Sequence, residues 1–586
     1  MNKRLKRLWV PRRHDHARTL AFAEHTGLAP AIAAILLSRG LTTVESAEHF
    51  LRPSLEALPD PFTMKGMQEA TRCLEEALRL KKTVLIYADY DVDGTTGAAV
   101  LGHFLAEHGL VVHYHQPCRL KDGYGLQAAS IRRLREQLGN SGEARPVLIT
   151  VDCGISNHAE IALARELGFT VLLTDHHRPS ATLPAADAIL NPWQPGCEFP
   201  CKSLAGVGVA FYLLMGLRTH LTQQGYWEGR PPPNLRRYLD LVALGTIADI
   251  VPLVGANRIM VKAGLQELAK SERPGLLALL RVADLSGPRI TSEDVAFQLA
   301  PRLNAAGRVG SAERALRLLL TQSSTEAMTL ARLLDEENQN RKELEANVYQ
   351  EAFVQAEEIF GRNKQVAVVQ GHGWHLGVVG IVAAKLMHAF YRPVVLLSLE
   401  NGRAKGSARS IPGIDLYECL RECEGLLDKF GGHASAAGVQ LKTTQIQLFA
   451  DKIEEVVSGL IDPGILQPRL DVDWNFDGPA ELDEKLLADF FMLEPFGKDN
   501  ERPVFTGDVR EFLLAPRRVG AGRDHLRFQL RVGQGKLDGV GFNLGHLNER
   551  LAAEGAAIAF SFKVNAFRGK ERAEVLASDL LFESDK

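Results

Sequence analysis

The chain has 586 residues, of which 46% are hydrophobic and 24% are charged, as in ordinary globular proteins. This length predicts roughly three or four domains rather than one core. The formal net charge of −3 excludes nucleic-acid binding through an overall basic charge, so a nucleic acid would have to be bound in a local groove.

The sequence contains no apolar run long enough to cross a bilayer, and its basic start lacks the apolar core of a secretory signal. We therefore expect a cytoplasmic protein without membrane association. The seven cysteines are odd in number and few for this length, which predicts reduced thiols rather than disulfides.

Short helical patterns with proline-rich spacers occupy residues 1–66 and predict a helical cap followed by a linker. An amphipathic helix is expected at residues 67–80. The apolar run at residues 84–86 is rich in branched side chains and predicts a buried parallel strand. Ligands of open α/β sheets bind at the carboxyl ends of such strands.

Asp89, Asp91 and Asp93 follow this strand. If the strand continues through Asp93, its period of two places the three carboxylates on one face, where a pair about 4 Å apart repels by roughly 1–4 kcal/mol. A bound cation would offset this repulsion. A turn then leads into a helix expected at residues 97–108, whose N-terminus favours an anionic group. A polar strand exit with aspartate as a helix cap explains this stretch equally well.

Two later strands end in the same way. Residues 147–151 lead to Asp152, and residues 170–174 lead to Asp175, His176 and His177. Either histidine alone would more often be structural, but three such strand ends are hard to explain by packing. Carboxylate and imidazole ligands suit Mn²⁺, Mg²⁺ or Zn²⁺, and the mixture favours a paired-metal site for phosphoryl transfer.

Two further stretches add candidate residues. Asp249 is flanked by apolar residues, which is a costly place for an unpaired carboxylate. A metal would account for it, and a helix cap or a salt bridge is the alternative. Arg302, Asn304 and Arg308 lie among small residues, and the arginines could hold a phosphate in a bidentate fork or form surface ion pairs.

Six motifs occur in order along the chain. They are Asp-Tyr-Asp-Val-Asp-Gly from Asp89, Val-Asp-Cys-Gly from Val151, Asp-His-His from Asp175, Gly-Thr-Ile-Ala-Asp from Gly245, Pro-Arg-Leu-Asn-Ala-Ala-Gly-Arg from Pro301 and Gly-Gly-His-Ala-Ser-Ala-Ala-Gly from Gly431. The set resembles the DHH phosphoesterase superfamily. Within it, the chain is similar to the bacterial single-strand-specific 5′→3′ DNA exonucleases, from about residue 67 to its end.

This resemblance implies two divalent cations, Mn²⁺ or Mg²⁺, held by Asp91, Asp93, Asp152, His176 and Asp249. It makes Asp152 the bridging ligand, Asp89 a ligand or an outer carboxylate, and His177 a residue that faces the scissile phosphate. All seven are thereby expected to be catalytic. The implied reaction is in-line hydrolysis of single-stranded DNA from its 5′ end, releasing 5′-mononucleotides in recombination and repair without a covalent enzyme intermediate.

The fold class expected is α/β with several parts. Residues 67–322 form the DHH catalytic domain with a parallel sheet, and residues 323–360, which lack Gly and Pro, form a long connecting helix. Residues 361–462 form a second, smaller α/β domain, which the resemblance identifies as DHHA1, with a hairpin turn at Asn401 and Gly402. Residues 463–586 alternate between apolar and polar positions, which predicts a C-terminal OB-like β-barrel.

The resemblance and the residue types also indicate where DNA binds. The candidate substrate-binding residues are Asn304, Arg308, Arg409, Ser410, Gly432 and His433. In the barrel, arginines recur with Phe528 and Phe542, which could stack on bases for about 1–3 kcal/mol each or pack in the core.

Two alternatives share part of these motifs. One is a DHH phosphodiesterase of small substrates such as short oligonucleotides or cyclic dinucleotides, and the other is a non-catalytic DNA-binding relative. The C-terminal barrel and the chain length favour long single-stranded DNA, and the intact ligand set favours an enzyme. A monomer is expected, with a RecQ-type helicase and a single-strand-binding protein as candidate partners.

Overall fold

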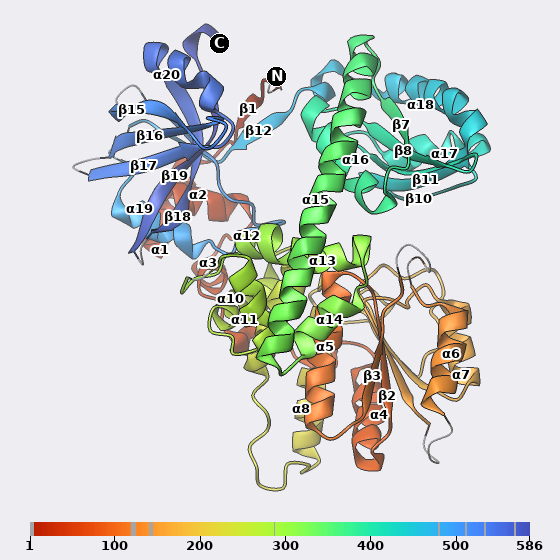
Figure 1. Cartoon of the computed structure of the whole chain (residues 1–586). Helices are drawn as coiled ribbons and strands as arrows, with labels where there is room; N and C mark the ends of the chain where they lie inside the picture. Colours follow the sequence, from red (N-terminus) through yellow and green to blue (C-terminus); the bar gives the residue numbers. More distant parts are fainter. Residues whose placement is uncertain are drawn as a thin grey trace.

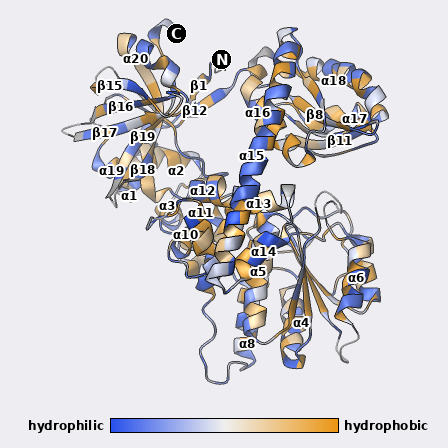
Figure 2. Cartoon of the chain, in the orientation of Figure 1, coloured by the Kyte–Doolittle hydropathy of each residue, from blue (hydrophilic) through white to orange (hydrophobic). Residues whose placement is uncertain are grey.

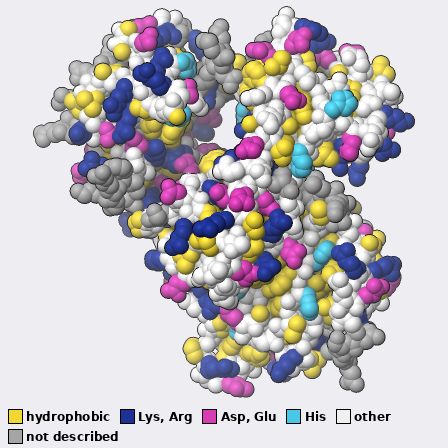
Figure 3. All heavy atoms as spheres, viewed as in Figure 1, with side chains coloured by type: hydrophobic (Ala, Val, Ile, Leu, Met, Phe, Trp, Pro, Cys, Tyr) yellow, Lys and Arg dark blue, Asp and Glu magenta, His cyan; other side chains and the backbone are white. Residues whose placement is uncertain are grey.

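The computed structural model has a body that carries two lobes (Figure 1). We call them the β7–β11 lobe and the terminal lobe, because the second one contains both ends of the chain. The structure describes residues 5–118, 123, 125–139, 145–285, 287–478, 481–509, 512–532, 535–567 and 570–585. On the face drawn in Figure 3, Lys and Arg side chains are spread over all three parts among acidic ones, in keeping with the small net charge.

The body is built on a parallel sheet with the strand order β3-β2-β4-β5-β6. The strands are β2 (Val84–Ala88), β3 (Val112–His115), β4 (Val147–Val151), β5 (Thr170–Thr174) and β6 (Ala188–Leu190). Every residue of β2 and β4 is buried, and Figure 2 shows the sheet as largely hydrophobic. The predicted parallel sheet is therefore confirmed, and its carboxyl ends meet at one edge.

Helices cover both faces of this sheet. One face packs against α4 (Met67–Leu80), α5 (Val92–Glu107) and α8 (Gly206–Gln223), and α9 (Leu239–Ala248) packs against α5 and α8. The other face packs against α6 (Ala128–Leu138) and α7 (His158–Glu166). The body is completed by α10 (Gly255–Leu268), α11 (Pro274–Val282), α12 (Ser292–Asp294), the π-helix Val295–Leu299, α13 (Ala300–Val309) and α14 (Glu313–Leu320).

The expected continuation of β2 through Asp93 is wrong. The strand ends at Ala88, and α5 begins at Val92 rather than at residue 97. The physical reason is the cap: the Asp91 carboxylate accepts a hydrogen bond from the Gly94 N–H at 3.1 Å and starts the helix there. Asp91 thus fits the helix-cap interpretation, and Asp93 lies in the first turn of α5.

The long helix α15 (Ser324–Gly361) connects the body to the β7–β11 lobe. Its 38 residues span about 57 Å at the α-helical rise. The first half buries Leu330 and Leu334 in the core of the body, and the second half buries Val348 and Ala352 in the core of the lobe. One rigid element therefore fixes the distance between the two parts.

The β7–β11 lobe contains a mixed sheet with the order β10-β11-β9-β8-β7. Its strands are β7 (Ala367–His372), β8 (Val394–Glu400), β9 (Arg403–Arg409), β10 (Lys429–His433) and β11 (Ala436–Lys442), with helices α16 (Leu376–Phe390), α17 (Leu416–Arg421) and α18 (Ile446–Leu460). The predicted hairpin is confirmed, because Glu400 pairs with Arg403 and the φ angles of Asn401 and Gly402 are 49° and 77°.

The terminal lobe contains a seven-stranded sheet with the order β13-β14-β18-β19-β17-β16-β15. The strands are β13 (Trp474–Phe476), β14 (Phe505–Val509), β15 (Phe512–Val519), β16 (His525–Val532), β17 (Gly535–Gly541), β18 (Ala556–Phe567) and β19 (Lys570–Leu581), with helices α19 (Glu484–Met492) and α20 (Asn548–Glu554). Among the described residues no pairing joins the edge strands β13 and β15 into a closed barrel. Phe528 is buried in the core, and Phe542 is exposed.

The N-terminal segment belongs to this lobe in space. Strand β1 (Leu8–Pro11) pairs in parallel with β12 (Arg469–Val472), and α1 (His16–Thr26), α2 (Pro30–Ser38) and α3 (Val44–Leu51) share a core with the C-terminal sheet. In the part of the chain that the structure describes, no single helix is both long and apolar enough to span a membrane, and only the bent pair α1–α2 meets that test jointly, by length and composition.

Candidate metal centre

The ends of three strands and one helix bring acidic and imidazole groups to one edge of the body. Asp89 follows β2, Asp152 follows β4, His176 follows β5, and Asp249 caps the end of α9. Three groups of these side chains each place their ligand atoms within 4.8 Å of one another: Asp89, Asp91 and Asp152; Asp93, His176 and Asp249; and Asp152, His176 and His177. The seven residues predicted as catalytic therefore lie together.

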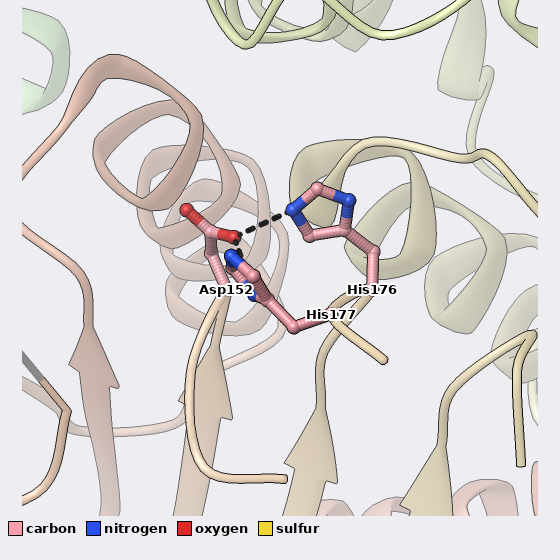
Figure 4. Close-up of side chains that lie close together, drawn as sticks. All are labelled: Asp152, His176 and His177. Atoms are coloured by element: carbon pink, nitrogen blue, oxygen red, sulfur yellow. Dashed lines mark ion pairs between the residues drawn. The ribbon is translucent and has the colours of Figure 1, made fainter. Parts of the chain in front are cut away.

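His176 lies at the middle of the cluster. Its Nε2 is 3.1 Å from Asp152 Oδ1, 3.6 Å from Asp249 Oδ2 and 3.8 Å from Asp93 Oδ2. Figure 4 shows the rings of His176 and His177 on two sides of the Asp152 carboxylate. One imidazole thus links carboxylates that come from three different segments of the chain.

The backbone around the cluster holds the carboxylates in place. The Gly206 and Val207 N–H groups, at the start of α8, donate to the two oxygens of Asp93 at 2.6 and 2.8 Å. Gly206 also lies directly against Asp152, since a Cβ at this position would be 2.7 Å from the Asp152 Cβ. Asp152 itself has a φ of 61°, an uncommon conformation for a non-glycine residue. Such strain at the centre of an acidic cluster is typical of functional sites.

The protein alone supplies too little positive charge for this cluster. Burial and the neighbouring Asp91 raise the pKa of Asp93 to about 7, and burial with Asp93 and Asp91 raises the pKa of Asp249 to about 9. Burial and the same neighbours raise the pKa of Asp152 as well. Burial and His177 lower the pKa of His176 to about 4, so this ring is neutral and can act as a ligand.

The donor set fits divalent cations. His176 Nε2 and Asp249 Oδ2 are both buried, and among the described residues neither atom has a hydrogen-bond partner. Buried polar atoms without partners are costly, and a cation between them would remove that cost. Carboxylate oxygens with one imidazole nitrogen are suitable ligands for Mn²⁺ and Mg²⁺.

Asp175 holds His177 in position. Its carboxylate accepts hydrogen bonds from the Ile155 N–H at 2.9 Å, from the His176 and His177 N–H groups at 2.7 and 3.0 Å, and from His177 Nδ1 at 2.8 Å. Burial opposes a charge on His177, but the hydrogen bond and the charge of Asp175 raise the pKa of His177 to about 9. His177 is therefore a protonated side chain at the edge of the cluster.

Two connected cavities open above the cluster. The first, of about 320 Å³, is lined by Asp89, Asp91, Asp152, His177 and Asp249 together with Asn304 and Arg308. The second, of about 630 Å³, shares Asn304 and Arg308 and continues between the body and both lobes. We call the second one the strand cavity. Its lining includes Ile250 and Phe297, which are 68% and 77% exposed.

The predicted substrate-binding residues divide into two groups. Asn304 and Arg308 line both cavities, and Arg308 Nη1 donates to the Gly377 carbonyl at 3.2 Å, at the start of α16. Arg409 lies against the same helix, since a Cβ at Gly380 would be 3.1 Å from its Nη2.

The other predicted residues surround Arg409 or lie beneath it. The strand register places His433, Ala436 and Arg409 side by side on three strands, and Gly432 precedes His433. The structure does not bring the Ser410 side chain to this surface: it is buried, and its hydroxyl donates to the Ile414 carbonyl at 3.0 Å.

Sequence reasoning missed several residues of the site. Asp175 was visible within the Asp-His-His motif, and its position after a buried strand was a signal for it. Ile250 and Phe297 gave no signal, because exposure of an apolar side chain depends on the tertiary fold. Lys498 of the terminal lobe also lines the strand cavity, and it gave no signal either, because this contact depends on packing between distant segments.

Comparisons with known proteins agree with this geometry. The model of the DHH family, N-terminal domain matches residues 83–246, so the body and its acidic edge are of the DHH class. The DHHA1 domain matches residues 363–459, and the RecJ OB domain matches residues 475–579.

Relatives extend the similarity to nearly the whole chain. The single-stranded-DNA-specific exonuclease RecJ of Bacillus subtilis is 37% identical over 577 residues, covering 98% of this chain and 71% of that protein, and RecJ of Escherichia coli is 36% identical over 569 residues, covering 94% and 96%. The crystal structure of RecJ from Thermus thermophilus in complex with Mn²⁺ matches with a TM-score of 0.78 and 33% identity, covering 98% of this chain and 79% of that chain. The chain belongs to the RecJ family of single-stranded-DNA-specific exonucleases.

Proposed function

We propose that this protein is a single-stranded-DNA-specific exonuclease that hydrolyses phosphodiester bonds with two divalent cations, Mn²⁺ or Mg²⁺. The observation that carries the proposal is the convergence of Asp91, Asp93, Asp152, His176 and Asp249 beside a cavity that Asp91, Asp152 and Asp249 line and that opens into the strand cavity. Relatives that match nearly the whole chain carry this activity in their names, so the small-substrate alternative is not retained.

The ligand groups support two cation positions. Asp89, Asp91 and Asp152 form one, and Asp93, His176 and Asp249 form the other. Asp152 is the bridge in this proposal, because its Oδ1 lies 3.1 Å from the His176 of the second group. Asp89 is a ligand or an outer carboxylate. Bound cations would activate the attacking water and stabilise the charge that develops on the phosphate.

His177 acts on the phosphate in this proposal. Asp175 accepts its Nδ1–H, which fixes the ring and raises its pKa to about 9. The ring lines the cavity, so Nε2–H donates a hydrogen bond to a phosphate oxygen and stabilises the in-line transition state.

The substrate strand runs along the strand cavity in this proposal. Asn304 and Arg308 bind the strand next to the metals. Arg409, Gly432 and His433, which belong to the β7–β11 lobe, bind one of its phosphates. Ser410 supports the turn under Arg409 from the core. A passage enclosed by the body, α15 and the docked terminal lobe accepts one strand and rejects a duplex.

Further parts of the proposal rest on the family resemblance. The enzyme degrades DNA from 5′ to 3′, releases 5′-mononucleotides and works as a monomer in recombination and repair, with a RecQ-type helicase and a single-strand-binding protein as partners. No two of the described cysteines form a disulfide, which suits the reducing cytoplasm. The proposed division of the chain is residues 1–66, 67–322, 323–360, 361–462 and 463–586, and the first of these segments packs with the last in the terminal lobe.

The test is digestion of single-stranded DNA labelled at the 5′ or the 3′ end, beside the matched duplex, with Mn²⁺, Mg²⁺ or EDTA. The expected result is immediate release of mononucleotides from the 5′ label, only from single strands and only with metal. Cleavage of dinucleotides without degradation of long DNA would contradict the proposal, as would activity in EDTA.

A further inference from the structure

A loop of the terminal lobe docks on the body beside the metal cluster. We call residues 493–502, between α19 and β14, the docking loop. The Leu253 N–H donates to the Lys498 carbonyl at 2.8 Å, and the Ser292 hydroxyl donates to the Phe496 carbonyl at 2.6 Å. Leu253 lies four residues after Asp249, so the loop is bound to the segment that directly follows this candidate metal ligand.

The docking loop is held rigidly from its other side. Asn500 is completely buried, and its Nδ2 donates to the carbonyls of Leu493 and Pro495 at 2.9 and 2.7 Å. Its Oδ1 accepts from the Arg39 guanidinium at the end of α2. Gly497 lies so close to Leu253 that an added Cβ would be 2.6 Å from the Leu253 Cδ1. The N-terminal segment and the body thus clamp the loop between them.

This clamp places Lys498 at the strand cavity. The side chain is exposed and lines the cavity together with Asn304 and Arg308. Burial and two aspartates raise the pKa of Asp249, and the charge of Lys498 opposes that rise. The ammonium group is therefore near enough to influence the metal cluster, although it belongs to a different lobe.

Lys498 differs in its partners from Arg341 and Arg502, two other cations of the cavity. Arg341 is paired with Glu345 at 2.6 Å, and Arg502 is paired with Glu293 at 2.8 Å. Within the described part of the chain, Lys498 has no ion-pair partner within 4.0 Å. Much of the remaining lining is apolar, including Ile250, Phe297 and Phe496. Lys498 therefore provides a positive charge that is available to an anion in this cavity.

We infer that Lys498 binds a backbone phosphate of the single-stranded substrate in the strand cavity, so that docking of the terminal lobe supplies a cation to the DNA site of the body. The inference rests on the proposed function. Lysine suits this role, because its ammonium group is a compact charge on a flexible stem that reaches a phosphate without a fixed fork geometry.

The test compares Lys498→Met with Lys498→Arg and with a control, Lys364→Met, which removes an exposed lysine after α15. Steady-state hydrolysis of a single-stranded oligonucleotide is measured with saturating Mn²⁺ at several salt concentrations. The expected result for Lys498→Met is a KM raised several-fold, an unchanged kcat, and a salt dependence of log KM that is flatter by about 0.7. Lys498→Arg restores KM, and Lys364→Met behaves as the wild type.

Two outcomes would overturn the inference. If Lys498→Met had the KM and the salt dependence of the control, Lys498 would not bind substrate. If, in a parallel titration with Mn²⁺, only the Mn²⁺ concentration needed for activity changed, Lys498 would serve as a counter-charge for Asp249. Failure of the proposed function is distinguishable, because the wild type itself would then not degrade single-stranded DNA.

Discussion

At the scale of the residue, the candidate metal centre is built around the contact between His176 and three carboxylates. Nε2 lies between 3.1 and 3.8 Å from oxygens of Asp152, Asp249 and Asp93. Carboxylates whose oxygens lie within 4.8 Å of each other, as those of Asp93 and Asp249 do, repel one another when they are ionised. The raised pKa values in this cluster reflect that repulsion together with burial. The arrangement is unfavourable without cations and favourable with them.

Asp152→Asn is the variant that separates function from stability. It removes the bridging charge, so hydrolysis of single-stranded DNA is expected to fall by more than about a hundredfold, since even outer partners of metal ligands are worth 10–100-fold. The thermal midpoint measured in EDTA should stay the same or rise, because a repulsive charge has been removed. Lys364→Met serves as the surface control. A variant with the wild-type rate would show that Asp152 holds no catalytic metal.

At the scale of the element, the site is made by the ends of strands and the beginnings of helices. The carboxyl ends of β2, β4 and β5 supply Asp89, Asp152 and His176, and the start of α8 supplies N–H groups for Asp93. The sheet edge and the helix N-terminus concentrate these groups in one place, which no single element could do. Titration of this edge should therefore control the stability of the metal-free protein.

The pH dependence of stability follows from the raised pKa values. Asp93 and Asp249, with pKa values of about 7 and about 9, bind protons more tightly in the folded protein than in the unfolded chain. Their contribution to stability is thus complete at low pH and is lost as the pH rises through those values. In EDTA the thermal midpoint should fall between about pH 5 and about pH 9. Mn²⁺ should raise it most at high pH, because cations replace the protons. Parallel curves with and without Mn²⁺ would contradict this coupling.

Prediction from sequence succeeded for features that neighbouring residues determine and failed for features that depend on contacts between distant segments. Apolar runs identified the strands at Val84, Val147 and Thr170, and the Asn401-Gly402 pair identified its hairpin, because period and turn chemistry act over a few residues. The start of α5 was misplaced, since an aspartate after a strand can continue it or cap a helix. The burial of Ser410 and the contact of Lys498 with the strand cavity depend on packing between distant segments, which no local pattern contains.

At the scale of the whole molecule, the two ends of the chain form one lobe. Residues of α1–α3 share a core with strands more than 400 positions away, and Arg39 reaches the docking loop. The terminal lobe is thereby anchored to the body through a loop beside the metal cluster. The sequence patterns of residues 1–66 predicted helices but did not indicate that these helices pack against the C-terminal sheet.

Ile32→Ala tests whether the N-terminal segment is part of the terminal core. Ile32 of α2 is completely buried in that core, so the variant should lose about 2–5 kcal/mol of stability in this lobe. Hydrogen exchange should quicken in β14 and β18 as well as in α1–α3. Leu20→Ala, on the exposed side of α1, is the matched control. Faster exchange confined to α1–α3 would mean that the N-terminal segment covers the lobe without being part of its core.

The measurement that tests the central claim most directly is anomalous scattering from crystals grown with Mn²⁺. The account predicts two peaks about 3.5–4 Å apart. The first should lie against Asp91 and Asp152, and the second against Asp93, His176 and Asp249, with Asp152 touching both. A single peak, or peaks away from these side chains, would contradict the two-cation site from which the proposed hydrolysis follows.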